Sequence, residues 1–198
     1  LAHVLKTPLA VVTNELGNED KILMSQVQLM KKQIDRYLKK AHLDSVGKVT
    51  KDKININELS EKMVRIFRKL YSNKDIKIRS SNNMALVLSS LEDMEEVIGN
   101  IVENACKWGE KMVIIDINNK SEEEFEMIIS DDGPGLPENK MSRVFARGFR
   151  LDEQTPGTGL GLNIVKDIVE MCKGSVCLAK SKELGGLEVK IILPLSKA

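Results

Sequence analysis

The apolar positions of residues 1–43 recur with the period of an α-helix and are interrupted once. The interruption is Gly-Asn-Glu-Asp at residues 17–20, where glycine can end one helix and Asn or Asp can cap the next. In the second helical stretch the apolar stripe consists of Val27, Met30, Ile34, Tyr37 and Ala41. A single stripe cannot enclose a core, so we expect a hairpin that dimerises into a four-helix bundle. Packing of this hairpin on the rest of the chain is the alternative.

Residues 44–53 show no periodicity and are predicted to be a linker, and residues 54–198 alternate between strand and helix patterns. Strands are expected at residues 54–56, 76–78, 85–88, 113–117, 125–130, 176–179 and 187–193, and helices from residue 57, over 91–108 and over 159–171. The first helix should bury Leu59, Met63, Ile66, Phe67 and Leu70, and the second Met94, Val97, Ile98, Ile101, Val102 and Ala105. A strict βαβ rhythm is missing. The fold class is therefore α+β, with the helices on one face of a mixed sheet.

Composition and charge narrow the classes of partner. The 198 residues are 42% hydrophobic but only 4% aromatic, so the core should consist mainly of Ile, Leu, Val and Met. Thirty Lys and Arg nearly balance 29 Asp and Glu, which argues against nucleic acid or an anionic membrane as the main partner. The cysteines Cys106, Cys172 and Cys177 lack metal-ligand spacing and are expected to be reduced and buried.

Membrane association through this stretch of sequence is not expected. No apolar run approaches the roughly 20 residues that span a bilayer, and no signal peptide is recognisable. Because Leu1 is an unusual start for a natural protein, we expect a piece of a longer chain, and any membrane segment would lie outside it.

Residues 100–108, Asn-Ile-Val-Glu-Asn-Ala-Cys-Lys-Trp, form the first of three candidate binding segments. Asn100 and Asn104 lie four residues apart, on one helical face, and their amide oxygens are ligands that Mg²⁺ accepts when it also holds phosphates. Lys107 could reach a phosphate oxygen, and Trp108 offers a face on which a base can stack. Taken alone, an ordinary pair of helical asparagines is the better explanation of this segment, since such pairs are common.

The second segment is Asp131-Asp-Gly133-Pro-Gly135, directly after an apolar strand. An aspartate at a strand end can accept a hydrogen bond from an exocyclic amine, and glycines let a ligand ring approach the backbone. A simple turn is the alternative. The third segment, residues 155–162, places Gly157, Gly159, Gly161 and Leu162 before a helix, where free N–H groups can bind an anion. No βαβ unit surrounds these glycines, which argues against a dinucleotide site.

In combination, the order and separation of the three segments resemble the N, G1 and G2 boxes of the GHKL ATPases, and residues 144–150 resemble the F box of the histidine kinases. The resemblance covers residues 54–195 and implies a Bergerat-type α/β sandwich that holds ATP and Mg²⁺ under a mobile lid. It implies that Asn100 and Asn104 serve the metal, Lys107 the phosphates, Asp131 the adenine amino group and Trp108 the base. It also implies that Gly157, Gly159 and Gly161 shape the lid, and that Arg147 and Arg150 neutralise phosphate charge.

Residues 1–9, Leu-Ala-His-Val-Leu-Lys-Thr-Pro-Leu, resemble the H box of sensor histidine kinases. The resemblance implies that His3 is phosphorylated from ATP, with Lys6 and Thr7 in the same catalytic segment, and that Thr7 orients water for dephosphorylation of the partner. It further implies transfer of the phosphoryl group to an aspartate of a response-regulator protein. The chain would then be the cytoplasmic part of a homodimeric sensor in a bacterial inner or plasma membrane, attached through segments missing here.

One position departs from the usual pattern of this family. Val4 stands where an acidic residue commonly follows the histidine and acts as general base. The PhoQ-type sensors, which this chain also resembles, likewise lack an acid there. The alternatives are therefore a kinase-impaired ATP-binding phosphatase or scaffold, and, less favoured because of the H and F boxes, another GHKL ATPase.

Overall fold

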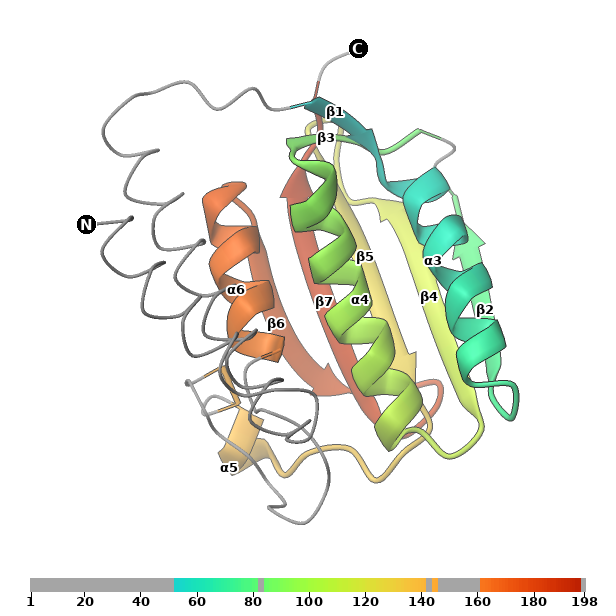
Figure 1. Cartoon of the computed structure of the whole chain (residues 1–198). Helices are drawn as coiled ribbons and strands as arrows, with labels where there is room; N and C mark the ends of the chain where they lie inside the picture. The colour runs from blue at the N-terminus through green and yellow to red at the C-terminus, as the bar shows by residue number, and fades with distance from the viewer. Residues whose placement is uncertain (1–51, 82–83, 142–143, 146–160, 197–198) are drawn as a thin grey trace, which may run out of the picture. The chain divides into compact units, whose positions relative to one another are not determined.

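The computed structural model describes residues 52–81, 84–141, 144–145 and 161–196 (Figure 1). All of them belong to the second of two compact units, Lys51–Ala198. The predicted hairpin of residues 1–43, the linker up to residue 51 and most of the predicted F-box and lid segments lie outside the described residues.

A five-stranded mixed sheet forms the floor of the unit. Its strand order is β2-β4-β5-β7-β6, with β2 parallel to β4 and every other pair antiparallel. The strands are β2 (Asp75–Ser80), β4 (Met112–Asn119), β5 (Glu124–Asp131), β6 (Ser175–Lys180) and β7 (Leu187–Pro194). A separate antiparallel pair consists of β1 (Asp52–Asn55) and β3 (Leu86–Ser89). The predicted mixed sheet is confirmed, and β1 takes in the last two residues of the stretch predicted as linker.

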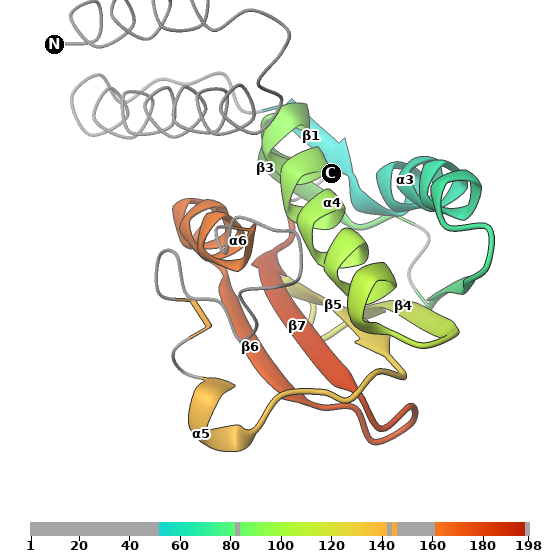
Figure 2. The same cartoon turned by 60° about the horizontal axis from the view of Figure 1, so that its bottom comes forward.

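Three helices cover one face of this sheet, as Figures 1 and 2 show: α3 (Ile56–Leu70), α4 (Leu91–Trp108) and α6 (Gly161–Met171). The side chain of Asn55 caps α3 by accepting from the N–H groups of Asn57 and Glu58, and Ser90 caps α4 through the N–H of Asp93. A short helix, α5 (Glu138–Met141), lies where neither a helix nor a strand was predicted.

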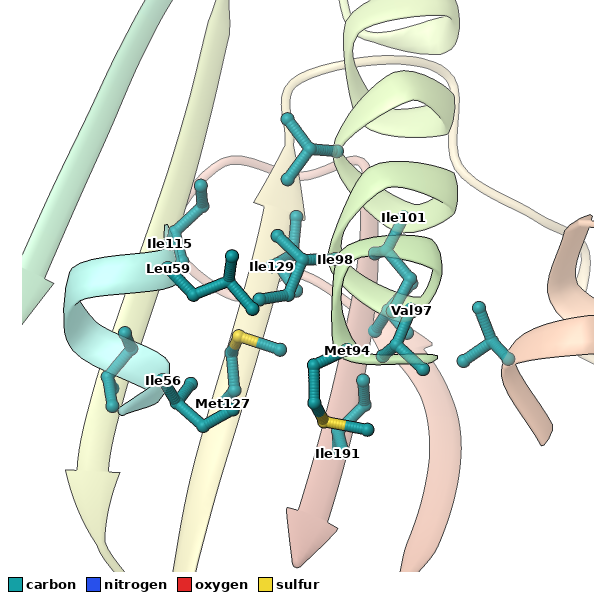
Figure 3. Close-up of a cluster of buried hydrophobic side chains, with 14 of the residues drawn as sticks. Ile56, Leu59, Met94, Val97, Ile98, Ile101, Ile115, Met127, Ile129 and Ile191 are labelled. Atoms are coloured by element: carbon teal, nitrogen blue, oxygen red, sulfur yellow. The ribbon is translucent and has the colours of Figure 1, made fainter. Parts of the chain in front are cut away.

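The core lies between the helices and the sheet (Figure 3). Side chains from α3, α4 and three central strands meet there: Ile56, Leu59, Met94, Val97, Ile98, Ile101, Ile115, Met127, Ile129 and Ile191. All six residues predicted for the inner face of α4 are buried. Aliphatic side chains and methionine fill most of this space, as the low aromatic content predicts, and Phe125 is the largest fully buried side chain among the described residues.

Two predictions about burial were wrong. On α3, Ile66 and Leu70 are 45% and 68% exposed, and the helix instead buries Ser60 and Val64. The apolar stripe of α3 is broader than the surface available to cover it, so the helix turns its Val64 edge inward and leaves the other edge in solvent. Cys177 is exposed because β6 is an edge strand and only its neighbours Val176 and Leu178 face the core.

Across the described ranges, no helix combines the length and the apolarity that a bilayer crossing requires.

Candidate functional site

The carboxyl-terminal half of α4 carries three of the predicted site residues on one face. Asn100, Asn104 and Trp108 follow one another at intervals of four, so their side chains project in similar directions, over roughly 12 Å of helix. Both asparagines are half-buried, whereas Trp108 is 43% exposed at the end of the helix. The other two candidate segments both border this helix. Gly133 of the second segment lies against Trp108, and Gly161 of the third lies against Asn100.

Asp131 ends β5 as a buried carboxylate that is 3% exposed. Its Oδ1 accepts hydrogen bonds from the N–H of Gly133 at 2.9 Å and from the N–H of Leu187 at 3.2 Å. Within the described part of the chain, no group donates to Oδ2. One oxygen of the carboxylate is therefore fixed by the backbone, and the other is left to accept from a ligand.

Burial raises the pKa of Asp131, and the two backbone hydrogen bonds only partly offset this effect. The pKa of the next residue, Asp132, is shifted in the opposite direction. Burial alone would raise its pKa too, but hydrogen bonds from the backbone N–H groups of Met112, Lys111 and Glu110 hold it below the ordinary value. Its carboxylate ties the start of β4 to the end of β5, with Oδ1 2.8 Å from the Glu110 nitrogen. Backbone N–H groups thus occupy the carboxylate of Asp132, whereas Asp131 retains one oxygen for another partner.

The backbone around Asp131 is packed too closely for side chains. A Cβ at Gly133 would lie 2.2 Å from the carbonyl oxygen of Trp108, and a Cβ at Gly186 would lie 2.4 Å from Asp131 Oδ1. Gly135 has a φ of +68°, in the left-handed region that favours glycine. The glycines of residues 133–135 therefore seat the strand end against α4 and against the turn before β7.

The start of α6 meets α4 at Asn100. The Nδ2 of Asn100 donates to the carbonyl of Glu96 at 2.7 Å, and a Cβ at Gly161 would lie 2.8 Å from Asn100 Oδ1. Gly161 is the first residue of α6 and not part of a loop. The first turn of α6 contains no acidic residue, so within this turn no carboxylate offsets the positive end of the helix. Leu162, half-buried, follows Gly161 there.

Lys107 and Asn104, two further predicted residues, differ in whether their side chains have a partner in the part of the chain that the structure describes. Lys107 does not extend freely: its Nζ lies 2.7 Å from Glu103 Oε1 in an ion pair along α4. Asn104 makes no side-chain hydrogen bond to any described residue, which leaves its amide for a ligand. In the same ranges no group of three or more His, Cys, Asp or Glu side chains is arranged to hold a metal.

Several residues that position this site were not identified from the sequence. Lys74 donates to the carbonyls of Gly109 and Glu110 and so fixes the end of α4. Gly186 and Leu187 hold Asp131, and the double glycine before the last strand could have indicated their role. Asn163 on α6 donates to the carbonyl of Phe145 at 3.1 Å, which links the F-box segment to this helix.

His3, Lys6, Thr7, Arg147, Arg150, Gly157 and Gly159 lie outside the described residues.

Comparison with known proteins adds to this geometry. Residues 89–197, more than half of the chain, match the family described as histidine kinase-, DNA gyrase B-, and HSP90-like ATPase. The chain belongs to this ATPase family. The matched residues include α4, Asp131 and the start of α6, which together form the site.

Within the family, similar curated proteins are sensor kinases. The virulence sensor histidine kinase PhoQ of Salmonella typhimurium is 30% identical over 97% of this chain. The sensor protein kinase CarS of Pseudomonas aeruginosa is 34% identical over 100% of it. Both likenesses run through nearly the whole length of this chain. The chain spans 42% and 46% of the lengths of these two relatives.

Solved structures support the fold of this ATPase unit. The mycobacterial sensor histidine kinase MprB superposes with a TM-score of 0.67 at 24% identity, over 75% of this chain and 99% of that one. Full-length ShkA, solved in complex with AMPPNP, gives a TM-score of 0.68 at 21% identity, over 100% of this chain and 45% of that one.

Proposed function

We propose that this chain is the cytoplasmic core of a bacterial sensor histidine kinase, which phosphorylates His3 from ATP and passes the phosphoryl group to an aspartate of a response regulator. The observation that carries the proposal is the buried Asp131, whose second oxygen is left for a ligand beside the asparagine face of α4. Family membership and the two sensor-kinase relatives support it, and the likeness to CarS extends over the whole of this chain, residues 1–9 included.

In this proposal the nucleotide lies along α4 with its base at the Trp108 end and its phosphates at the Asn100 end. Asp131 Oδ2 accepts a hydrogen bond from the adenine amino group, and Trp108 lines the base together with Gly133 and Gly135. The phosphates lie near the amino terminus of α6, where Gly161 and Leu162 contribute to the site and the helix dipole favours negative charge. Gly157, Gly159, Arg147 and Arg150 would complete the phosphate side as parts of the lid.

The donor set on α4 fits Mg²⁺ bound together with ATP. The amide of Asn104 makes no hydrogen bond to a described residue, and Asn100 keeps its Oδ1 while its Nδ2 is engaged. Neutral amide oxygens and phosphates form the kind of site that Mg²⁺ occupies when it binds with a nucleotide. Bound there, the ion would neutralise charge on the phosphates during transfer. Lys107 would leave Glu103 for a phosphate oxygen, an exchange that is cheap for an exposed ion pair.

The reaction is phosphoryl transfer to a neutral imidazole. A ring nitrogen of His3 uses its lone pair to form the N–P bond, while the bond between the γ-phosphorus and the bridging oxygen breaks and ADP leaves. Catalysis of such a step rests mainly on positioning and charge neutralisation. The phosphoryl group then passes to the regulator's carboxylate and restores His3. The regulator would dock on the helical hairpin, through which two chains dimerise.

Val4 favours a second activity of the same segment. A valine after His3 cannot accept a proton, which slows autophosphorylation and shifts the balance toward dephosphorylation of the regulator, with Thr7 orienting the water. Measured with purified phosphorylated regulator, dephosphorylation should fall in Thr7→Ala but persist in His3→Gln. Loss in both variants to the same extent would contradict the role of Thr7.

The test of kinase activity is incubation of the chain with γ-labelled ATP and Mg²⁺. We expect acid-labile, alkali-stable label on the wild type and none on His3→Gln. Lack of label on the wild type, or equal label on both proteins, would overturn the proposal. Release of free phosphate at the same rate by wild type and His3→Gln would indicate another kind of ATPase.

A further inference from the structure

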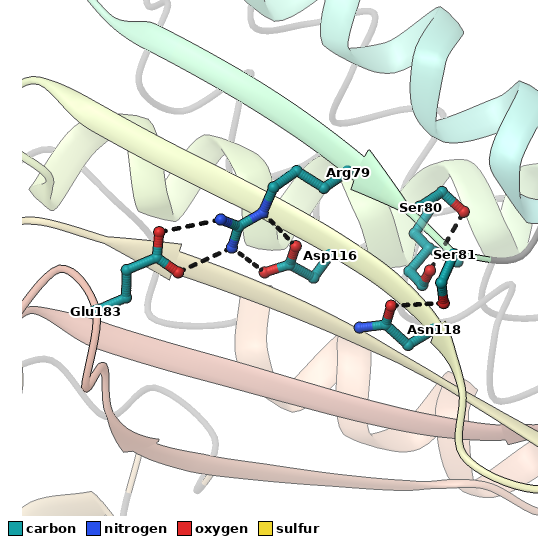
Figure 4. A network of polar contacts seen from close by, with 7 residues as sticks. Arg79, Ser80, Ser81, Asp116, Asn118 and Glu183 are labelled. Carbon is teal, nitrogen blue, oxygen red and sulfur yellow. Dashed lines mark hydrogen bonds and ion pairs between the residues drawn. The ribbon is translucent and has the colours of Figure 1, made fainter.

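Arg79 lies on the face of the sheet opposite to the helices and has no place in the ATP site described above. It stands on β2 beside Asp116 of the parallel strand β4. Its guanidinium makes two hydrogen bonds to Asp116, at 2.6 and 2.7 Å, and two to Glu183, at 3.0 and 2.8 Å (Figure 4). Both carboxylates are thus held by one arginine in the paired geometry that gives such contacts their strength.

Glu183 comes from a distant part of the sheet. It lies in the turn of residues 181–186 between β6 and β7, and β7 is three strands away from β2, or roughly 14 Å. An arginine side chain cannot cover that distance, so the turn must lean across the outer face toward β2. Ile114 points to this outer face, between the core residues Val113 and Ile115, yet it is only 3% exposed. Its burial agrees with a turn that lies over the sheet.

The same turn holds Asp131. At its end, the N–H of Gly186 donates to the Asp131 carbonyl at 3.2 Å, and the N–H of Leu187 donates to Asp131 Oδ1. The turn is also stiffened internally. Ser181 and Gly186 are joined by a backbone hydrogen bond of 2.8 Å, and the Ser181 hydroxyl accepts from the N–H of Leu184. A constraint applied at Glu183 therefore reaches the two N–H groups that set the position of Asp131.

We propose that Arg79 is a positioning residue for adenine recognition: braced by Asp116, it holds Glu183 and thereby fixes the turn that orients Asp131. This inference rests on the proposed role of Asp131 in reading the adenine amino group. It assigns a function in nucleotide selectivity to three charged side chains that never touch the nucleotide.

The test compares two nucleotides, ATP and purine riboside triphosphate, which lacks the exocyclic amine. The measured quantity is the dissociation constant of purine riboside triphosphate divided by that of ATP, obtained by calorimetry on the full chain. A change in this ratio reports on Asp131, whereas a general loss of structure weakens both nucleotides equally. Glu183→Gln removes one charge from an exposed side chain. Glu122→Gln is the matched control, because Glu122 is also exposed but lies in the turn between β4 and β5.

We expect Glu183→Gln to lower the ratio about threefold, within the range of an exposed ion pair, chiefly by weakening ATP. Arg79→Gln should lower it further, because Asp116 and Glu183 then repel each other, and the double variant with Glu183→Gln should recover part of that loss. Glu122→Gln should keep the wild-type ratio.

Two results would overturn the inference. Asp131 would recognise adenine without help from this network if Glu183→Gln and Arg79→Gln keep the wild-type ratio while Asp131→Asn brings it to one. If both nucleotides weaken in parallel, the network is only structural. A wild type that binds both nucleotides equally would remove the proposed role of Asp131 itself, and this inference with it.

Discussion

At the scale of single residues, two neighbouring carboxylates at the end of β5 differ in their hydrogen bonds. Both oxygens of Asp132 accept from backbone N–H groups at the start of β4, and its pKa is lowered. Only one oxygen of Asp131 accepts from the backbone, and burial raises its pKa. A buried carboxylate that is only half satisfied destabilises the free protein, and a ligand that donates to it recovers that loss.

Asp131→Asn should separate binding from stability. We expect ATP to bind between roughly ten- and a hundredfold more weakly, because the amide that replaces Oδ2 cannot accept from the adenine amino group. The unfolding midpoint should not fall. Calorimetric titration and thermal unfolding of the same samples measure both quantities. Equal ATP affinity in the two proteins would show that Asp131 does not contact the base.

The pH dependence of this variant follows from the raised pKa of Asp131. Because the folded protein holds this proton more tightly than the unfolded chain does, the contribution of Asp131 to wild-type stability falls as the pH rises above about 4, through the raised pKa. Asp131→Asn lacks this loss. The difference in melting temperature, variant minus wild type, should therefore grow from about pH 4 to pH 7; a constant difference would contradict the raised pKa.

Asp132→Ala should behave in the opposite way. It leaves the N–H groups of Glu110 and Lys111 without their acceptor, which should cost about 1–3 kcal/mol of unfolding free energy at neutral pH. A carboxyl with a lowered pKa stabilises the fold above its unfolded pKa and ceases to do so as the pH falls through its folded pKa. Denaturant unfolding should show the loss shrinking below about pH 4. An undiminished loss in acid would point to packing instead of charge.

At the scale of elements, α4 is the part of the molecule that the sequence predicted best. Its bounds, its buried stripe and its asparagine face all follow from one long period without a break. On α3 the pattern failed, because a stripe wider than the covered surface does not say which edge turns inward. Local periodicity also could not predict that Gly186 and Leu187 contact Asp131, since these residues lie more than fifty positions from it, and only the double glycine pointed to a close approach there.

Gly133→Ala tests the close contact between the end of β5 and α4. An alanine Cβ would overlap the Trp108 carbonyl, so the backbone must shift; we expect a loss of about 1–3 kcal/mol and weaker ATP binding. Gly99→Ala is the matched control. It lies inside α4, where its Cβ would be 3.3 Å from the flexible end of Met63, and it should stabilise the protein by up to about 1 kcal/mol. Chemical denaturation distinguishes the two, and equal stability of both variants would contradict the packing described at Gly133.

At the scale of the whole molecule, the site depends on joining segments that are ambiguous by themselves. An asparagine pair, an Asp-Gly turn and a glycine-rich helix start each have an ordinary structural explanation. In the fold, Gly133 packs on Trp108 at one end of α4, and Gly161 packs on Asn100 near its middle, so the three segments border one surface. The sequence could predict this convergence through the family resemblance, because local periodicity carries no information about which segments meet.

The central claim is that ATP bound along α4 phosphorylates His3, and Asn104→Ala tests it most directly. This change removes an amide that makes no hydrogen bond to a described residue and substitutes a stronger helix former, so the fold should be retained. Phosphorylated residues are mapped by mass spectrometry under neutral conditions after incubation with ATP and Mg²⁺. The account predicts phosphohistidine at His3 in the wild type and its loss in Asn104→Ala. Phosphate at another residue, or equal phosphorylation of His3 in both proteins, would contradict it.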